Sequence, residues 1–340
     1  MLQQPTFDFI PDIHPKLFSA ILDGNVVVFV GNGVSRLVGV PSWQELAYMF
    51  LDDWFACENT DLSYDAYEKL KLAKTDPLEL LTICAGKIGK DKLKKQLFDK
   101  LQGKLTEKNI EKIREIYKYI RDFRAGYITT NYDDFLETSI PSSNMLSNQE
   151  NKLDKNVSDS LTRVGLNDSL QCIKNKIVYL HGKAVKPGSH CEDSIPNKII
   201  LTLEDYLEHY KDKEGLGKEF LSHIFAEHVF LFIGFGLREF EIIQHIQRPD
   251  ISHTHYILLG ASDYEYPILE QYKKYYSLLN ITPIFYNMSK KGYHQLESVL
   301  AKWSLDIRTA RKERLNELKC SQKNIENLRH IRSLGNGIFR

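Results

Sequence analysis

Four short apolar runs end abruptly in glycine or polar residues, and this pattern constrains the fold more than any other feature of the chain. The runs cover residues 26–30, 127–128, 177–180 and 229–233. Apolar runs of strand length that stop at turn residues indicate buried strands. From residue 229 onward, such strands alternate with helical patterns, and this alternation predicts parallel βαβ units. The sequence therefore predicts an α/β fold with a Rossmann-like, doubly wound, mostly parallel sheet, a helical insertion and a C-terminal helical appendage.

The first run leads into a glycine turn. Val30 is followed by Gly31, Asn32 and Gly33. Glycine lets the backbone approach an anion closely, and the N–H groups of such a turn, with the positive end of a following helix, attract a phosphate. The full GxGxxG fingerprint is absent because Arg36 stands where its last glycine would be. Taken alone, this turn is as consistent with a tight strand-to-helix connection as with a phosphate site.

The other three runs also place small or polar residues at the carboxyl ends of strands. These residues are Thr130, Asn131, Asp133, His181, Gly182, Gly234 and Gly236. In an open parallel sheet, ligands bind beyond the carboxyl ends of the strands. His181 is suited to acid–base work there, because the unperturbed pKa of histidine lies near neutrality. The four strand ends together indicate a nucleotide cleft.

The order of these motifs resembles the sirtuin (Sir2) fold, in its bacterial sirtuin-like branch associated with antiphage defence. The resemblance covers residues 20–290. Gly31, Gly33 and Ser35 match the family's Gly-Ala-Gly-x-Ser loop. Asn131 and Asp133 match its Thr-Gln-Asn-x-Asp motif.

The later part of the chain continues the resemblance. His181 matches the catalytic His-Gly of the family, and Gly234 and Gly236 match the glycine turn that holds the adenosine half of NAD. The chain departs from the family pattern at Asn32, where the family has alanine, and at Thr130, where it has glutamine. The family segment Gly-Ile-Pro-Asp-Phe-Arg is also replaced, by residues 39–43 of different sequence.

The resemblance implies a role for each of these positions. It implies Asn131, His181 and Asp133 as catalytic residues. The cofactor-binding residues that it implies are Gly31, Asn32, Gly33, Ser35, Thr130, Gly234 and Gly236.

Protein-deacylating sirtuins carry a zinc ribbon of two Cys-x-x-Cys pairs after the catalytic histidine, and this chain has none. Its five cysteines form no Cys-x-x-Cys pair. Tetrahedral zinc needs four correctly spaced N or S ligands. His190 and Cys191 are adjacent, but a second pair is lacking. We therefore expect no metal, and a cofactor pocket without a peptide platform suggests that NAD itself is the substrate.

This interpretation predicts an NAD+ hydrolase that breaks the nicotinamide–ribose bond through a transition state resembling an oxocarbenium ion. His181 would act as general base on water or a ribose hydroxyl, Asn131 would orient the water and the ribose, and Asp133 would stabilise positive charge. The alternatives are a sensor that binds NAD or an ADP-ribose derivative without cleaving it, and a protein deacylase. The missing zinc ribbon disfavours the deacylase.

Helix signals divide the chain further. Ser42 with Glu45 and Thr202 with Asp205 form capping boxes at two predicted helix starts, and we interpret both as structural. Trp43 is interpreted as a packing residue.

The predicted domain spans residues 1–290. It contains a helical insertion at 76–121 with a solvated, lysine-rich face, and an irregular loop or lid at 138–175. Residues 291–340 form a predicted C-terminal helical segment for oligomerisation or partner docking. Its residues from 305 onward carry nine Lys and Arg against four Asp and Glu.

Composition excludes several classes of protein. The chain has 45 basic and 45 acidic residues, so we do not expect direct nucleic-acid binding. No apolar run is long enough for a membrane span, and no signal peptide is evident in residues 1–15. Unpatterned cysteines suit a reducing compartment.

We expect a cytoplasmic homo-oligomer. The family resemblance implies a toxic effector restrained by another protein, such as a HerA-type ATPase or a short Argonaute.

Overall fold

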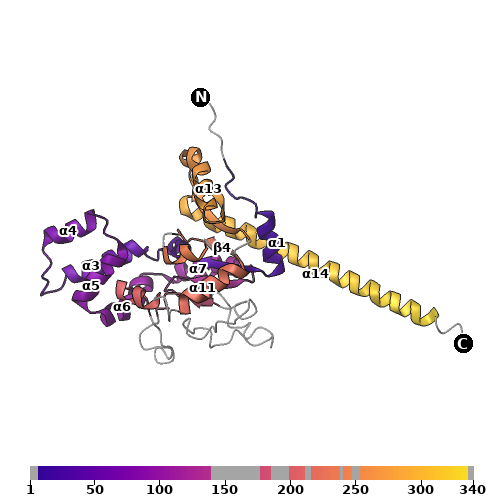
Figure 1. The fold of residues 1–340 in the computed structure, drawn as a ribbon, viewed down its shortest axis with the longest axis horizontal. Helices are drawn as coiled ribbons and strands as arrows, with labels where there is room; N and C mark the ends of the chain where they lie inside the picture. The colour runs from indigo at the N-terminus through magenta and orange to yellow at the C-terminus, as the bar shows by residue number, and fades with distance from the viewer. Residues whose placement is uncertain are drawn as a thin grey trace.

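The structure is a computed structural model with three parts, shown in Figure 1: a body built on the sheet, a helical lobe beside it, and a long helix that extends away from the body. It describes residues 7–138, 177–184, 199–210, 216–237, 240–246 and 253–335. The predicted loop or lid at 138–175 lies outside the described residues except for its first residue, and so do His190 and Cys191.

Six parallel strands form one sheet in the order β3-β2-β1-β4-β5-β6. The strands are β1 (Val26–Val30), β2 (Gly126–Thr129), β3 (Ile177–Tyr179), β4 (Val229–Ile233), β5 (His255–Ala261) and β6 (Ile281–Asn287). This order places β1 beside β4, where the sheet begins to extend in the opposite direction. Such a switch point is where open α/β sheets bind ligands. The predicted Rossmann-like α/β fold is therefore confirmed.

Helices cover both faces of the sheet. Val26, Val28 and Val30 pack with one set of helices, whereas Val27 and Phe29 pack with the other. Because both faces of β1 are buried, its sequence is apolar throughout instead of alternating. The first face is covered by α1 (Pro15–Asp23), α7 (Glu107–Arg121) and α14 (Gln295–Gly335), and the second by α11 (Leu216–Glu227), α12 (Phe240–Ile246) and α13 (Leu269–Ser277).

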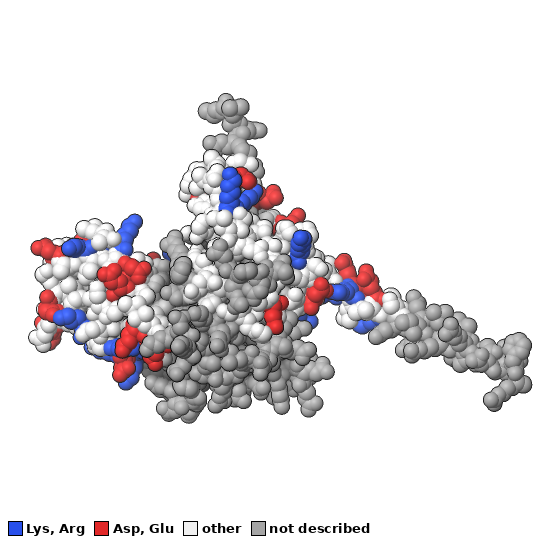
Figure 2. Space-filling view, in the orientation of Figure 1, with Lys and Arg blue, Asp and Glu red and all other residues white. Residues whose placement is uncertain are grey.

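The helical lobe joins the same hydrophobic core from one side. It consists of α3 (Trp43–Phe55), α4 (Tyr64–Leu72), α5 (Pro77–Ile88) and α6 (Lys90–Gln102). The predicted capping box of Ser42 and Glu45 starts α3, and Trp43 stacks on Tyr132 with ring centroids 5.7 Å apart. Figure 2 shows basic and acidic side chains interspersed over the visible surface of the lobe. The predicted insertion at 76–121 is helical. Its last helix, α7, belongs to the body and not to the lobe, because it packs on the first face of the sheet.

Short elements complete the connections between these layers. They are α2 (Asn32–Ser35), α8 (Phe135–Thr138), α10 (Leu203–His209) and three 3-10 helices at Arg36–Val38, Asp263–Ile268 and Gly292–His294. The helix α13 begins at Leu269, because the residues before it form the 3-10 helix that contains Pro267.

The long helix α14 has two unlike parts. Its first turns are buried in the core through residues that include Leu300, Trp303 and Ile307. From residue 312 to residue 321 every side chain is exposed, and the helix ends at Gly335. The segment at 291–340 therefore begins as part of the domain core and continues as a projecting rod (Figure 1). Among the described helices, none combines the length and apolar composition that a membrane span requires.

Candidate functional site

The glycine turns after β1 and β4 pack directly against each other at the switch point of the sheet. Gly31 N donates to Ile233 O at 2.9 Å, and Gly33 N donates to Gly234 O at 2.8 Å. A Cβ on Gly31 would overlap the Gly234 carbonyl, and a Cβ on Gly33 would lie 2.8 Å from Gly234 Cα. The glycines are thus required by this close approach. The N–H groups of Gly31 and Gly33 already donate hydrogen bonds within the protein. An anion at this loop would therefore have to contact other groups.

The other predicted residues of these turns differ in their surroundings. Asn32 Nδ2 donates to Pro41 O at 2.8 Å, which ties the turn to the segment leading into α3. Thr130 is half-buried after β2, and Gly236 is exposed after β4.

A buried polar network lies at the carboxyl ends of β1 and β2. Ser35 Oγ lies 2.8 Å from Asp133 Oδ2 and 2.8 Å from Tyr117 Oη. Asn131 Nδ2 lies 3.4 Å from Ser35 Oγ and 3.3 Å from Tyr117 Oη. Serine has one hydroxyl proton, so when it donates to the Asp133 carboxylate, Tyr117 donates its own proton to Ser35. We call Ser35, Tyr117, Asn131 and Asp133 the inner network.

The network is completed by Tyr117, which sequence reasoning missed. Tyr117 projects from α7 and is 1% exposed, beside the buried Ile113, Ile116 and Ile120 on the same helix. The sequence did contain a signal for it, because a tyrosine within a stripe of isoleucines at helical spacing is predicted to be buried. A buried hydroxyl needs a polar partner.

The inner network contains an acid with a shifted pKa and an unpaired acceptor. Burial, with a smaller contribution from the nearby Asp134, raises the pKa of Asp133 to about 7 against the opposing effect of the hydrogen bond from Ser35. Asn131 Oδ1 is buried and has no hydrogen-bond partner within the described part of the chain. Buried polar atoms of this kind are normally paired, so an unpaired amide oxygen at a strand end is a candidate contact for a ligand hydroxyl.

His181 follows β3 and is held by a second group of side chains. Its Nδ1 lies 3.3 Å from Tyr206 Oη and its Nε2 lies 3.2 Å from Tyr210 Oη, both of them at or next to α10. We call these three residues the outer network. Burial lowers the pKa of His181 from its unperturbed value near neutrality to about 3, so the imidazole is neutral at pH 7. One tyrosine therefore accepts from the ring, and the other donates to it.

The two networks occupy adjacent strand ends. Thr129 of β2 is in register with Tyr179 of β3, so Asn131 and His181 each lie two residues beyond the last pair. Ala184 N donates to Tyr132 O at 2.8 Å, which ties the two turns together. The structure thus brings the three residues predicted to be catalytic together beyond the carboxyl ends of two neighbouring strands.

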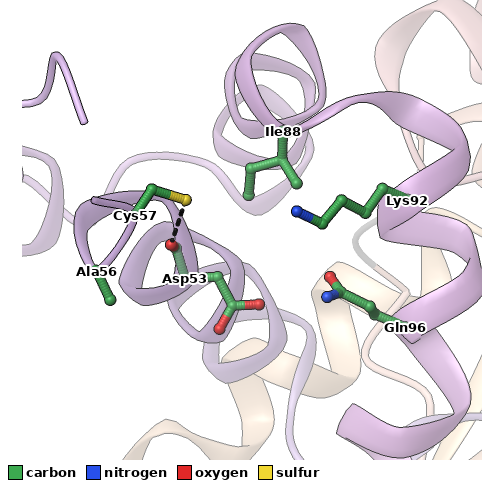
Figure 3. Close-up of a pocket in the computed structure, with 6 residues that line it drawn as sticks. All are labelled: Asp53, Ala56, Cys57, Ile88, Lys92 and Gln96. Atoms are coloured by element: carbon green, nitrogen blue, oxygen red, sulfur yellow. Dashed lines mark hydrogen bonds between the residues drawn. The ribbon is translucent and has the colours of Figure 1, made fainter. Parts of the chain in front are cut away.

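A separate hollow of about 270 Å³ lies within the helical lobe (Figure 3). It is lined by Asp53, Ala56, Cys57, Ile88, Lys92 and Gln96. Lys92 and Gln96 point into it from α6, and Cys57 Sγ lies 3.2 Å from Asp53 O. None of the predicted site residues lines this hollow.

The described residues include no cluster of three or more His, Cys, Asp or Glu side chains that could hold a metal ion. His190 and Cys191 lie outside the described residues.

Comparison with known proteins supports one family. The family model of the SIR2-like domain matches residues 125–284, which run from the start of β2 into β6. The match includes Asn131, Asp133, His181 and the glycine turn after β4, whereas the turn after β1 precedes it. No curated protein matches the chain. The match supports a Sir2-family domain over residues 125–284, and SIR2-like domains engage NAD.

Proposed function

We propose that this protein is an NAD+ glycohydrolase that cleaves the nicotinamide–ribose bond and releases nicotinamide and ADP-ribose. The SIR2-like match supports an NAD-using enzyme. The absence of any Cys-x-x-Cys pair in the sequence argues against the zinc ribbon of a protein deacylase. The observation that carries the proposal is the buried, unpaired Asn131 Oδ1 in the inner network, one strand away from the buried His181.

The unpaired oxygen gives the site a reason to bind a hydroxylated ligand. A buried acceptor without a partner costs about 1–3 kcal/mol, and this penalty is relieved when a ribose hydroxyl or a water molecule donates to it. The Asn131 amide is fixed on its other side by Ser35 and Tyr117. Asn131 therefore orients the ribose or the attacking water without having to reorganise.

Cleavage separates a neutral pyridine from a cation, so positive charge moves onto the ribose ring in the transition state. The ionised carboxylate of Asp133 stabilises that charge in a site shielded from water. The C–N electron pair leaves with nicotinamide, and a water oxygen forms the new bond to the anomeric carbon.

His181 accepts a proton from that water, either directly or through a ribose hydroxyl. Its imidazole is neutral at pH 7 and therefore able to accept a proton, whereas the burial that lowers its pKa to about 3 weakens it as a base. A positioned base contributes ~10²–10⁴-fold to rate. Tyr206 and Tyr210 hold the ring in place through its two nitrogens.

The test is release of nicotinamide and ADP-ribose from NAD+ by the purified protein and by Asn131→Ala and His181→Ala variants. We expect turnover to fall by ~10²-fold or more in both variants. His223→Ala, which removes an exposed histidine on α11, is the matched control and should retain turnover. Tight NAD binding by the wild type without turnover in any assembly would instead favour the sensor.

We propose further that the hydrolase acts in the cytoplasm as an antiphage effector that depletes NAD, restrained by a HerA-type ATPase or another defence partner. Unrestrained hydrolysis would empty the cell of cofactor, so activity must depend on assembly. This role predicts that phage infection lowers NAD in cells with the wild-type protein but not in cells with His181→Ala. An unchanged NAD level in both would contradict it.

The projecting part of α14 is our candidate for self-association. Leu315 and Leu318 are 51% and 57% exposed on adjacent turns of this rod. Burying such leucines against a second copy would add ~1.5–3 kcal/mol for each side chain. Sedimentation should show a smaller assembly for a Leu315→Lys, Leu318→Lys double variant than for the wild type.

A further inference from the structure

Helix α10 presents two tyrosines to His181 from one face. Tyr206 and Tyr210 are four residues apart, which places them on the same side of a helix. The His181 ring lies edge-on to both, with centroids 5.0 Å from Tyr206 and 6.4 Å from Tyr210. The position of the imidazole therefore depends on the position of α10.

Few apolar contacts hold α10 itself. The helix has seven residues, and its Leu203 and Leu207 are 46% and 61% exposed. Helices of this length are marginal without tertiary support. The support must come from specific contacts elsewhere on α10.

Asp205 supplies those contacts with both of its carboxylate oxygens. Oδ2 accepts from the backbone N–H groups of Leu201 and Thr202 at 3.1 and 3.0 Å, which organises the start of α10. Oδ1 lies 2.8 Å from Lys90 Nζ and 3.0 Å from Lys94 Nζ. The Asp205 side chain is only 3% exposed, so water screens these pairs less than it would at an open surface.

The two lysines belong to the helical lobe. Lys90 and Lys94 are one turn apart on α6, where two like charges repel each other unless a carboxylate lies between them. Leu203 N also donates to Thr82 Oγ1 of α5 at 2.9 Å. Contacts from α5 and α6 thus meet at the start of α10, within seven residues of both tyrosines that touch His181.

We propose that Asp205 is a positioning residue for His181: its ion pairs with Lys90 and Lys94 fix α10 to the helical lobe, and α10 holds the imidazole through Tyr206 and Tyr210. This inference rests on the proposed function in so far as His181 is the base. It assigns the lobe a role, because any movement of α6 relative to the sheet is transmitted to the imidazole. The capping box at Thr202 and Asp205 is therefore more than a helix start.

The first variant, Asp205→Asn, keeps an oxygen for the backbone of Leu201 and Thr202 and removes the charge that pairs with the lysines. The second, Lys90→Gln with Lys94→Gln, breaks the same link from the other side and leaves Asp205 in place. Asp306→Asn is the matched control, because it breaks a lysine–aspartate pair on α14, far from His181 in sequence and on another helix.

Two readouts are measured on each variant. We expect nicotinamide release to fall about tenfold or more in kcat with a smaller change in KM, since a misplaced base loses part of its ~10²–10⁴-fold contribution. We also expect the ¹⁵N resonances of the His181 ring, assigned with His181→Gln, to shift in both link-breaking variants and to stay unchanged in Asp306→Asn. A ring nitrogen that loses its hydrogen bond to a tyrosine hydroxyl changes its ¹⁵N shift.

The outcomes separate this inference from the proposed function. If both link-breaking variants fold and leave the His181 ring resonances and kcat as in the wild type, the positioning role is overturned, whatever the wild-type turnover is. Shifted ring resonances in a protein without NAD turnover in any assembly would support the positioning role and contradict the hydrolase. If Asp205→Asn does not fold, the double lysine variant decides, because it retains the cap of α10.

Discussion

The inner and outer networks lie at neighbouring strand ends but are held in different ways. Ser35, Tyr117, Asn131 and Asp133 are fixed by β1, β2 and the core helix α7. His181 is held by a seven-residue helix whose anchor is an ion-pair link to the helical lobe. The inner half of the site is therefore held by elements of the hydrophobic core, whereas the outer half depends on an ion-pair link between α10 and the helical lobe.

The titratable groups of the two networks have pKa values that are shifted in opposite directions. Burial raises the pKa of Asp133 to about 7 and lowers that of His181 to about 3. In both cases burial disfavours the charged form. At pH 7 the acid is close to half ionised and the imidazole is neutral, so only the inner network changes charge near physiological pH.

The largest expected effect is on the backbone contact beneath the inner network. Gly31→Ala places a Cβ against the Gly234 carbonyl, and we expect a loss of several kcal/mol in the free energy of unfolding, or no folded protein. Gly86→Ala is the matched control, because a Cβ added at this position inside α5 would meet no atom within 4 Å. There we expect a gain of up to about 1 kcal/mol. Equal denaturation midpoints for the two variants would contradict the close packing of the turns.

The next effect concerns Asp133 and depends on pH. Its pKa is raised in the folded state, so the folded protein binds this proton more tightly than the unfolded chain does. Stability from this group is therefore present below the unfolded pKa of about 4 and is lost as pH rises through about 7. Asp133→Asn should be more stable than the wild type at pH 8 by a few kcal/mol, with a smaller difference at pH 5.

Urea denaturation at both pH values measures this difference. Asp65→Asn, an exposed acid on α4, is the control and should show little change at either pH. The same difference between Asp133→Asn and the wild type at pH 5 and pH 8 would show that Asp133 is not buried as an acid. NAD turnover by Asp133→Asn should fall, because the amide cannot stabilise positive charge on the ribose.

His181 should make the free energy of unfolding fall as the pH is lowered below 7, which is the opposite of the dependence expected for Asp133. Its folded pKa is depressed, so its contribution is present above the unfolded pKa of about 6.5 and is lost as pH falls toward 3. Lowering the pH from 7 to 5 should therefore destabilise the wild type by about 2 kcal/mol more than it destabilises His181→Gln. The exposed His223→Gln should behave as the wild type does. Parallel pH profiles for all three proteins would exclude a buried neutral imidazole.

The smallest expected effect on the free energy of unfolding comes from removing one tyrosine hydroxyl from each network. Tyr117→Phe leaves Ser35 and Asn131 short of a partner inside the core, and we expect a loss of about 1–3 kcal/mol. Tyr210→Phe removes the partner of His181 Nε2 at a half-buried position, where water can replace it, and we expect less than about 1 kcal/mol. Thermal denaturation of both variants measures the difference. A larger loss in Tyr210→Phe would reverse the ranking of the two networks.

Predictions from the sequence succeeded where local signals coincide with burial. The strands at 26–30 and 229–233 occur at the predicted residues, because β-branched runs bounded by glycine are buried on both faces. Both predicted capping boxes are present. The parallel sheet also followed from the alternation of strands and helices. These features depend on residues near one another in the chain.

Predictions failed or were incomplete where distant segments meet. The sequence left the first glycine turn open between a phosphate site and a tight connection, and it could not show that β4 and the turn after it accept the N–H groups of Gly31 and Gly33. It gave no role to Tyr117, which lies 82 residues from its partner Ser35. The sequence could not indicate the lowered pKa of His181, because burial among α10 and the strand ends is not visible in a linear motif.

The strands, the class of sheet and the polar residues at the strand ends could be read from the sequence, because backbone propensity and hydrophobic pattern act over a few neighbours. Tertiary structure alone decided that Asp133 and Asn131 share a network with a tyrosine from α7. It alone decided that His181 is neutral and tied through α10 to the lobe. Charge state and orientation depend on burial and on partners about one hundred residues away, and these exist only once the chain has folded.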